Sequence, residues 1–163
     1  MNAAQFIFWI LLCQVPGLVG RAVTQHHMPW YHQLNQPFFT PPDGAFPVVW
    51  GALYLCLGCA GYLISRPRLN AQNRKTLRLF VLQLALNTLW APLFFGRQEM
   101  GWALLVLCAM IVLTGWIMRR VWQPARGAFW LLVPYLLWLL FAWGLSTALL
   151  LLNYKAPLKS GAV

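Results

Sequence analysis

Acidic residues are almost absent from this chain. Asp43 and Glu99 are the only side-chain carboxylates among its 163 residues, and charged residues make up 9% of the sequence. Soluble domains carry roughly 25% charged residues, so an ordinary solvated surface is excluded. The long apolar stretches hold no carboxylate, which argues against proton- or ion-coupled pumping, because such transport normally needs an ionisable group inside the membrane.

Long uncharged stretches take the place of the missing charge. The sequence is 61% hydrophobic, and its mean hydropathy is +0.63. Crossing a bilayer takes about 17–25 residues. Five stretches are long enough: Ala3–Val23, Phe46–Ile64, Leu79–Gly96, Gly101–Met118 and Gly127–Tyr154. The first lacks the basic start and the clean cleavage site of a signal peptide. The pattern predicts an all-α integral membrane protein in which residues 1–163 form one five-helix bundle.

The basic residues are divided unevenly between the two sides of such a bundle. One side would hold eight cations: Arg66, Arg68, Arg74, Lys75, Arg78, Arg119, Arg120 and Arg126. The other would hold both carboxylates and four cations: Arg21, Arg97, Lys155 and Lys159. Because cytoplasmic loops carry the excess of Lys and Arg, we expect the N-terminus inside and the C-terminus outside. The net charge of +10 then indicates contact with anionic lipid headgroups, and no nucleic-acid partner is expected.

The connector between the first two stretches, residues 25–45, is unusually aromatic. Its rings are Trp30, Tyr31, Phe38 and Phe39, with Phe46 just beyond, and prolines stand at 29, 37, 41 and 42. Proline lowers the entropy lost when a loop becomes ordered, and aromatic rings supply large buried areas. This composition predicts a lid that folds back onto an apolar surface.

Cysteine and histidine do not form a convincing metal site. Cys56 and Cys59 make a CxxC pattern, but small residues inside a membrane helix usually serve helix packing, and no second pair of ligands accompanies them. His26, His27 and His32 lie in or next to the connector. We interpret them as solvated loop residues, with ligation of haem iron or another metal as the alternative. No metal site and no required cofactor are predicted.

Three motifs follow one another along the chain. The first is Trp30-Tyr31-x-x-Leu34-x-x-Pro37-x-x-x-Pro41-Pro42, closed by Val49-Trp50-x-x-Leu53-Tyr54. The second is Gln83-Leu-Ala-Leu-Asn87-x-x-Trp90-x-Pro92-x-Phe94-Phe95-Gly96. The third is Pro134-Tyr135-Leu136-x-Trp138-x-x-Phe141-Ala142. In their order and spacing they resemble the TspO/MBR family, the tryptophan-rich sensory proteins that include the mitochondrial translocator protein. The resemblance covers roughly residues 30–153.

The resemblance implies a five-helix bundle, commonly dimeric, with a ligand cavity lidded by the first connector. It implies porphyrins such as protoporphyrin IX and haem as ligands, sterols in some members, and synthetic isoquinoline carboxamides. The family's cavity positions carry over onto Trp90, Trp138 and Ala142, with Asn87 nearby. A bacterial member in the inner membrane is expected. Ala85 and the Pro92–Gly96 segment of the third helix would let two copies approach closely, which predicts a homodimer.

The spacing of aromatic residues agrees with such a cavity. Trp90 and Phe94 are four residues apart and Trp138 and Phe141 are three apart, so each pair shares a helix face. Flat rings beside a stiff lid suit a flat macrocycle, while an interfacial belt is the alternative for tryptophan. The predicted ligand-binding residues are Trp30, Phe39, Phe46, Trp50, Asn87, Trp90, Phe94, Trp138, Phe141 and Ala142. Arg21 and Arg97 are predicted to pair with ligand carboxylates; anchoring at headgroups is their alternative role.

The connector also departs from the family pattern. Phe39 and Gly44 stand where the family usually has tryptophan. Some members are reported to degrade porphyrin in light through loop tryptophans, and phenylalanine lacks the easily oxidised indole, so no catalytic residue is predicted. The predicted function is binding of hydrophobic tetrapyrroles for sensing, regulation or facilitated movement. The alternatives are a light-dependent porphyrin-degrading enzyme and a structural or regulatory membrane partner.

Overall fold

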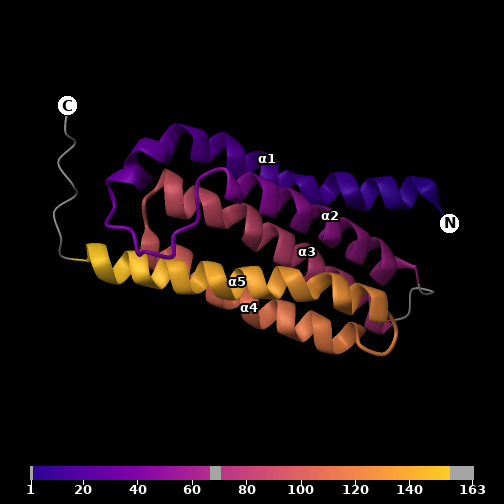
Figure 1. Cartoon of the computed structure of the whole chain (residues 1–163). Helices are drawn as coiled ribbons and strands as arrows, with labels where there is room; N and C mark the ends of the chain where they lie inside the picture. The colour runs from indigo at the N-terminus through magenta and orange to yellow at the C-terminus, as the bar shows by residue number, and fades with distance from the viewer. Residues whose placement is uncertain (1, 67–70, 155–163) are drawn as a thin grey trace.

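The chain folds into a bundle of long α-helices (Figure 1). The computed structural model describes residues 2–66 and 71–154. In these ranges the elements are α1 (Ala3–Gln33), α2 (Ala45–Ser65), α3 (Ala71–Ala91), the π-helix η1 (Pro92–Gly96), α4 (Met100–Val121) and α5 (Arg126–Asn153). Five spans, with α3 and η1 counted together, are long and apolar enough to cross a membrane. The described residues contain no β-strand, and the predicted five-helix membrane fold is confirmed.

The two ends of the bundle have different chemistry. The loop of residues 34–44 lies at one end, here called the loop end, together with η1 and the end of α5 (Figure 1). Both side-chain carboxylates belong to this end, because Asp43 is in the loop and Glu99 directly precedes α4. The start of α1, the end of α2 and the α4–α5 connection lie at the other end, here called the basic end.

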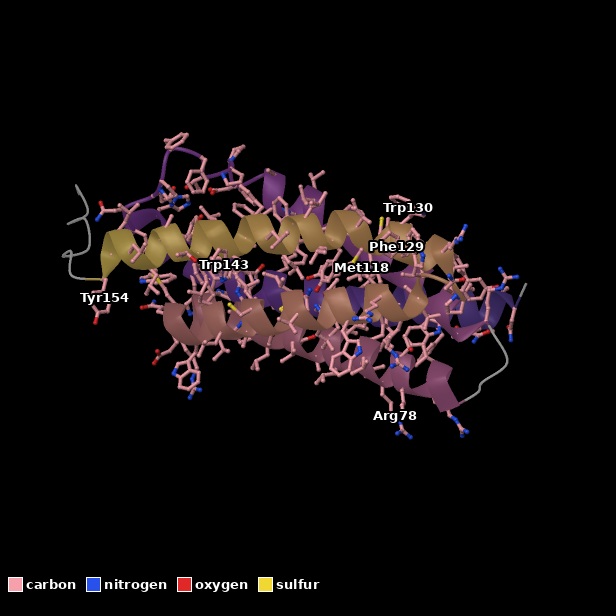
Figure 2. The ribbon with its side chains drawn as sticks, turned by 90° about the horizontal axis from the view of Figure 1, so that it is seen from below. Arg78, Met118, Phe129, Trp130, Trp143 and Tyr154 are labelled. Carbon is pink, nitrogen blue, oxygen red and sulfur yellow. The ribbon has the colours of Figure 1, made fainter. Side chains whose placement is uncertain are left out.

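The basic end collects the cations that the charge count assigned to one side. Figure 2 places Arg78 at the opposite end of the bundle from Tyr154. The described cations of the basic end are Arg66, Arg74, Lys75, Arg78, Arg119, Arg120 and Arg126. Arg68, Lys155 and Lys159, which also entered the charge count, lie outside the described residues. The segregation of charge is therefore a property of the fold as well as of the sequence.

Helix α1 is longer than the sequence suggested. It was expected to end at Val23, but it continues to Gln33. Pro29 lacks an N–H and removes one helical hydrogen bond, yet the last turns are stabilised because Tyr31 and the following Leu34 are buried in a cluster with Phe94. The expected connector of residues 25–45 is correspondingly wrong, and the loop contains only residues 34–44.

The third span shows the opposite effect of proline. It begins at Ala71, before the predicted Leu79, and its regular helix ends at Ala91. The ring of Pro92 cannot donate a helical hydrogen bond and crowds the preceding turn, and the chain widens into η1. The amide of Arg97 bonds to the carbonyl of Pro92 at 2.8 Å, the five-residue spacing of a π-helix. The other predicted boundaries agree with the structure to within a few residues.

Glycine allows α1 and α2 to approach closely at Gly58. A Cβ atom added at Gly58 would lie 2.7 Å from Ile10 Cδ1 and 2.9 Å from Ile10 Cα. The neighbouring Cys13 is completely buried, while Cys56 and Cys59 are partly exposed free thiols. Small residues thus allow close packing of the two helices here.

Candidate ligand-binding site

A cavity of about 730 Å³ opens at the loop end. Its wall comes from the second half of α1, the first half of α2, the end of α3 with η1, and the second half of α5. Ligand pockets typically enclose roughly 300–1,000 Å³ and are mainly apolar with a few polar groups. The volume and position of this cavity are those of a site for an organic molecule that enters near one membrane surface.

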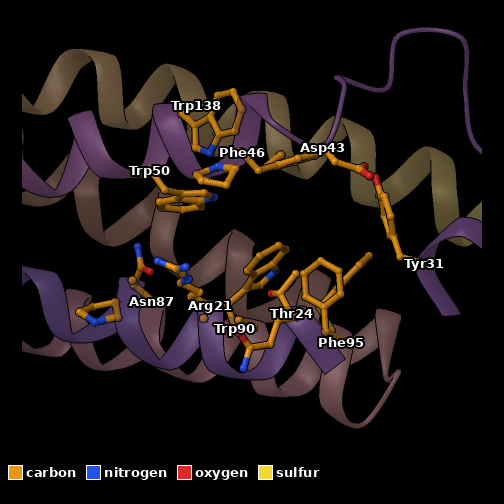
Figure 3. Close-up of a pocket in the computed structure, with 18 of the residues that line it drawn as sticks. Arg21, Thr24, Tyr31, Asp43, Phe46, Trp50, Asn87, Trp90, Phe95 and Trp138 are labelled. Atoms are coloured by element: carbon orange, nitrogen blue, oxygen red, sulfur yellow. The ribbon is translucent and has the colours of Figure 1, made fainter. Parts of the chain in front are cut away.

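Three tryptophans from three different helices form much of the wall. The ring of Trp50 in α2 lies 6.5 Å from that of Trp90 in α3 and 6.2 Å from that of Trp138 in α5. Figure 3 shows Trp50 and Trp138 along one side of the cavity, with Trp90 facing them from the other side. The bundle therefore brings together flat apolar faces that are far apart in the sequence.

Further rings hold these tryptophans in place. Trp90 stacks on Phe94 with ring centroids 5.3 Å apart and planes inclined by 19°. Trp138 packs against Phe141 at 5.3 Å. Both pairs come from the helical spacings seen in the sequence, and stacked or edge-on rings gain energy beyond burial alone. The wall is preorganised because these tryptophans pack against aromatic neighbours from their own spans.

Several polar groups on the wall have no partner within the described residues. The Nε1 atoms of Trp90 and Trp138 and the hydroxyl of Tyr31 are buried and form no hydrogen bond there. All three residues line the cavity. Buried donors are almost always paired, and an orphan requires an explanation. Within the described residues, the two indole N–H groups are therefore left without an acceptor.

Asn87 connects the cavity wall to a buried chain of hydrogen bonds. The Tyr54 hydroxyl donates to Asn87 Oδ1 at 3.0 Å, and Asn87 Nδ2 donates to the Tyr135 hydroxyl at 2.8 Å. Gln83 Nε2 donates to the same hydroxyl at 2.9 Å. Asn87 thus links α2, α3 and α5 through side-chain hydrogen bonds. Asn87 and Tyr54 both line the cavity, so these two members of the hydrogen-bond network form its polar floor.

Polar residues mark the rim of the cavity. Arg21 lines it from α1 but is exposed overall, which places its guanidinium at an opening. His32 at the end of α1 meets Asp43 of the loop, with 3.1 Å between His32 Nε2 and Asp43 Oδ2. The first helix was expected to end two residues after Arg21, at Val23, but α1 runs on to Gln33. The place of Arg21 is therefore on the side of the cavity rather than under the lid.

The structure brings most of the predicted ligand-binding residues to this cavity. The lining includes Arg21, Phe46, Trp50, Asn87, Trp90, Phe94, Trp138, Phe141 and Ala142. Trp30 stands behind the wall, with its ring 6.0 Å from that of Phe94. Phe39 lies 6.5 Å from Phe141 and is 40% exposed, and Arg97 caps η1 without lining the cavity. Ligand contact stays a prediction for all of these residues, and the last three do not line the cavity.

Some wall residues were missing from the predicted set. Thr24, Gln25 and Met28 of α1 line the cavity, and they were overlooked because this part of the chain was expected to be loop. Tyr54 was overlooked as well, although its spacing of four residues from Trp50 indicated a shared face. Their rings stack at 5.3 Å. A Cβ atom at Gly17 would lie 2.7 Å from the Tyr54 ring, so a glycine in α1 makes room for this tyrosine.

The three histidines lie on α1 instead of in a loop. His27 Nδ1 lies 2.8 Å from the carbonyl oxygen of Val23, one turn earlier. His26 Nε2 lies 3.2 Å from Gln25 Nε2, and His32 faces Asp43. Among the described residues, no three His, Cys, Asp or Glu side chains are grouped so that they could hold a metal ion. Aromatic rings and side-chain amides are the groups through which the cavity could contact a ligand.

Comparison with known proteins agrees with this architecture. Residues 9–152 match the model of the TspO/MBR family. A tryptophan-rich sensory protein from Cereibacter sphaeroides is 33% identical, with 96% of both chains covered. The tryptophan-rich protein TspO of Archaeoglobus fulgidus is also 33% identical over 94% of this chain and 99% of its own. The translocator protein of Ovis aries is 39% identical over 77% of this chain and 72% of its own.

The residues that match the family model include most of the helical bundle and the aromatic wall of the cavity. The matched range includes α2, α3, η1 and α4 in full, most of α1 and all but the last residue of α5, and with them the three wall tryptophans. The relatives named as sensory or translocator proteins align over most of this chain. Since the match spans nearly the whole five-helix bundle, this membrane protein belongs to the TspO/MBR family.

Proposed function

We propose that the cavity binds a hydrophobic tetrapyrrole such as protoporphyrin IX or haem, as a cargo or signal and not as a resident cofactor. The observation that carries the proposal is the wall of three tryptophans, two of which have unpartnered buried N–H groups. Flat rings stack on a planar macrocycle, and the N–H groups need acceptors. An apolar ring system with carboxylate substituents offers both a flat face for stacking and oxygen atoms that accept hydrogen bonds.

Arg21 is the cation best placed to meet a propionate of such a ligand. It is at the rim of the cavity, where a charged group keeps contact with water. An arginine forms paired hydrogen bonds with a carboxylate. Arg97 does not line the cavity, so its pairing with a propionate is the weaker half of the original prediction. Ala142 leaves room beside Trp138 and Phe141 for the ring.

The names of the relatives support a role in sensing or movement of the ligand. They read tryptophan-rich sensory protein and translocator protein. We extend these roles to this chain: the bound tetrapyrrole is sensed, its level is regulated, or its passage is assisted. Sterol-like molecules share the flat apolar shape and are the second ligand class for the same cavity.

The protein is proposed to lie in a bacterial inner membrane with the basic end in the cytoplasm. The described basic end carries no acidic side chain, while Asp43 and Glu99 are both at the loop end. The excess of Lys and Arg on the cytoplasmic side then gives an inside N-terminus and an outside C-terminus. The cavity would open toward the outer surface.

Light-driven porphyrin degradation is the alternative function that the retained tryptophans favour. Trp50 and Trp138 are oxidisable rings inside the cavity. Phe39 is outside the wall, and the space around Gly44 is open, so the loop contributes no indole. We expect slow loss of porphyrin absorbance in light, and faster loss in Phe39→Trp/Gly44→Trp. Rapid loss with the unaltered chain, beyond a protein-free control, would favour the enzyme.

Titration of the purified protein with protoporphyrin IX tests the binding proposal. Tryptophan fluorescence should be quenched with saturation at one ligand per chain. Trp138→Ala should weaken binding by roughly 1–3 kcal/mol, the range measured for stacking of a base on an aromatic ring. The matched control is Trp130→Ala in the same helix, because Trp130 is 63% exposed and does not line the cavity. Equal losses in both variants would contradict the assignment of the pocket.

The role of Arg21 is tested by removing either the positive charge of Arg21 or the carboxylates of the ligand. Arg21→Gln should weaken protoporphyrin IX binding and leave binding of its dimethyl ester unchanged, because the ester carries no carboxylate. Arg97→Gln should have a smaller effect on the acid. Equal loss for acid and ester in Arg21→Gln would discard the charge pairing while leaving the aromatic pocket in place.

A further inference from the structure

A second hollow lies at the basic end, remote from the ligand cavity. It is an open surface depression of about 790 Å³, lined by residues of the second half of α4 and of the turn after it: Val112, Gly115, Trp116, Arg119, Arg120, Gln123 and Pro124. None of these residues lines the cavity at the loop end. We infer that this hollow, here called the α4 groove, binds one anionic phospholipid, with its phosphate at Arg119 and an acyl chain over Gly115.

The apolar part of the α4 groove has the form of a slot for a hydrocarbon chain. Val112, Gly115, Trp116 and Arg119 follow the helical spacing of three and four residues and so share one face of α4. Val112 is 69% exposed and Trp116 is 56% exposed. A Cβ atom at Gly115 would have no heavy atom within 4 Å. The missing side chain at Gly115 therefore leaves an open notch between two exposed apolar residues.

The polar part of the α4 groove is cationic and has no carboxylate near it. Arg119 and Arg120 stand in the last turn of α4, at the end of an apolar span. Arg120 Nε also donates to Thr76 of α3 at 3.0 Å, which holds that guanidinium at the groove. The only two acidic side chains of the chain are at the loop end. The exposed guanidinium of Arg119 is therefore the group that we assign to an external anion.

The position of the α4 groove along the membrane-spanning helix favours a lipid over other anions. The groove runs from Val112, inside the apolar span, to Gln123 just beyond the helix. A phospholipid has the same order of groups, with an acyl chain in the core and a phosphate at the surface. Tryptophan prefers that boundary as well, and Trp116 sits between the apolar notch and the arginines.

Native mass spectrometry of the full chain tests the inference with two lipids of equal chain length. Dioleoyl phosphatidylglycerol should be retained on the protein in preference to dioleoyl phosphatidylcholine. Arg119→Gln should lower the retained phosphatidylglycerol about fivefold, the effect of one cation near an anionic membrane surface. Gly115→Leu should lower it as well, by filling the notch without clashing with the protein.

Matched controls separate a built groove from a diffuse basic surface. Arg78→Gln removes one exposed cation from the same end outside the groove, and Gly101→Leu adds the same side chain to an open position of the same helix. Both should retain the lipid as the unaltered chain does. If Arg78→Gln loses as much lipid as Arg119→Gln, the basic end acts only as a diffuse field and the inference is wrong.

Two further outcomes would also overturn it. If millimolar inorganic phosphate displaces phosphatidylglycerol completely, or Gly115→Leu has no effect, the hollow recognises a phosphate alone and takes no acyl chain. If the chain is dimeric and Gly115→Leu converts it to monomer, a second copy covers the groove. Retention of the lipid in phosphate, with losses only in Arg119→Gln and Gly115→Leu, supports the lipid site.

Discussion

Asn87 has two roles that belong to one side chain. It lines the cavity, and it is also the centre of the hydrogen-bond chain between Tyr54 and Tyr135. Its identity as a polar residue inside a helix was visible in the sequence. Its partners were not, because they are contributed by helices whose relative rotation is set only by packing.

Removing the amide of Asn87 should therefore reduce stability. Asn87→Leu leaves the Tyr54 hydroxyl without its acceptor, and an unpaired buried group costs about 1–3 kcal/mol, with interhelical bonds in membranes nearer the low end. We expect a lower thermal unfolding midpoint in detergent. Thr88→Val is the control, since within the described residues the Thr88 hydroxyl donates to the carbonyl oxygen of Leu84 in its own helix. Equal midpoints for the two variants would show that the buried chain adds little.

At the scale of elements, the helices and most of their ends were predictable, but the end of α1 and the start of α3 were not. Long uncharged stretches identified every span because the bilayer imposes a minimum length. The predicted end of α1 was wrong because Pro29 and the polar residues around it suggested a loop. In the structure, the burial of Tyr31 and Leu34 stabilises the last turns and the helix continues.

The family resemblance placed Trp90 and Trp138 on the wall, and the spacing of Phe94 and Phe141 agreed with it. Thr24, Gln25 and Met28 were lost with the misplaced helix end, whereas the other α1 residues of the wall lie in the predicted helix and carried no motif.

The loop is held to the bundle by one asparagine of α5. Asn153 Oδ1 accepts from the amide of Asn35 at 2.9 Å, and Asn153 Nδ2 donates to the Asn35 carbonyl at 3.1 Å. Asn153→Ala removes both bonds. We expect faster hydrogen exchange in residues 34–44 and little change in the core of α4, because local opening governs exchange in loops.

Asp43→Asn is the comparison for that experiment. The His32–Asp43 pair is about half exposed, and exposed ion pairs contribute roughly 0–1 kcal/mol. Its loss should change loop exchange less than the loss of Asn153 does. A larger effect from Asp43→Asn would mean that the ion pair, and not Asn153, holds the loop.

At the scale of the whole molecule, charge segregation predicts orientation. The basic end should face the cytoplasm. A periplasm-active reporter fused at the C-terminus should therefore be active, and a cytoplasm-only reporter at the same position should be silent. The reverse pattern would invert the proposed topology and place the cavity on the cytoplasmic side.

Assembly is proposed to use the outer face of α3. Val81, Leu82 and Leu89 are each about half exposed, and Ala85 lies exposed among them. Small residues let membrane helices approach closely, and we expect a homodimer in mild detergent. Ala85→Trp should shift the measured mass to that of a monomer. A monomer for the unaltered chain in both detergent and bilayers would contradict this proposal.

The central claim is that a tetrapyrrole occupies the cavity between Trp50, Trp90 and Trp138, and filling that cavity tests it most directly. Gly51 lines the cavity, and a Cβ atom there meets nothing within 4 Å, so Gly51→Leu occupies ligand space without disturbing the fold. Gly144→Leu adds the same side chain at an equally open position outside the cavity. In titrations followed by tryptophan quenching, Gly51→Leu should lower the affinity for protoporphyrin IX at least about tenfold, a loss of about 1.4 kcal/mol, and Gly144→Leu should leave it unchanged. Full affinity in Gly51→Leu would contradict the account, because the ligand would then bind elsewhere.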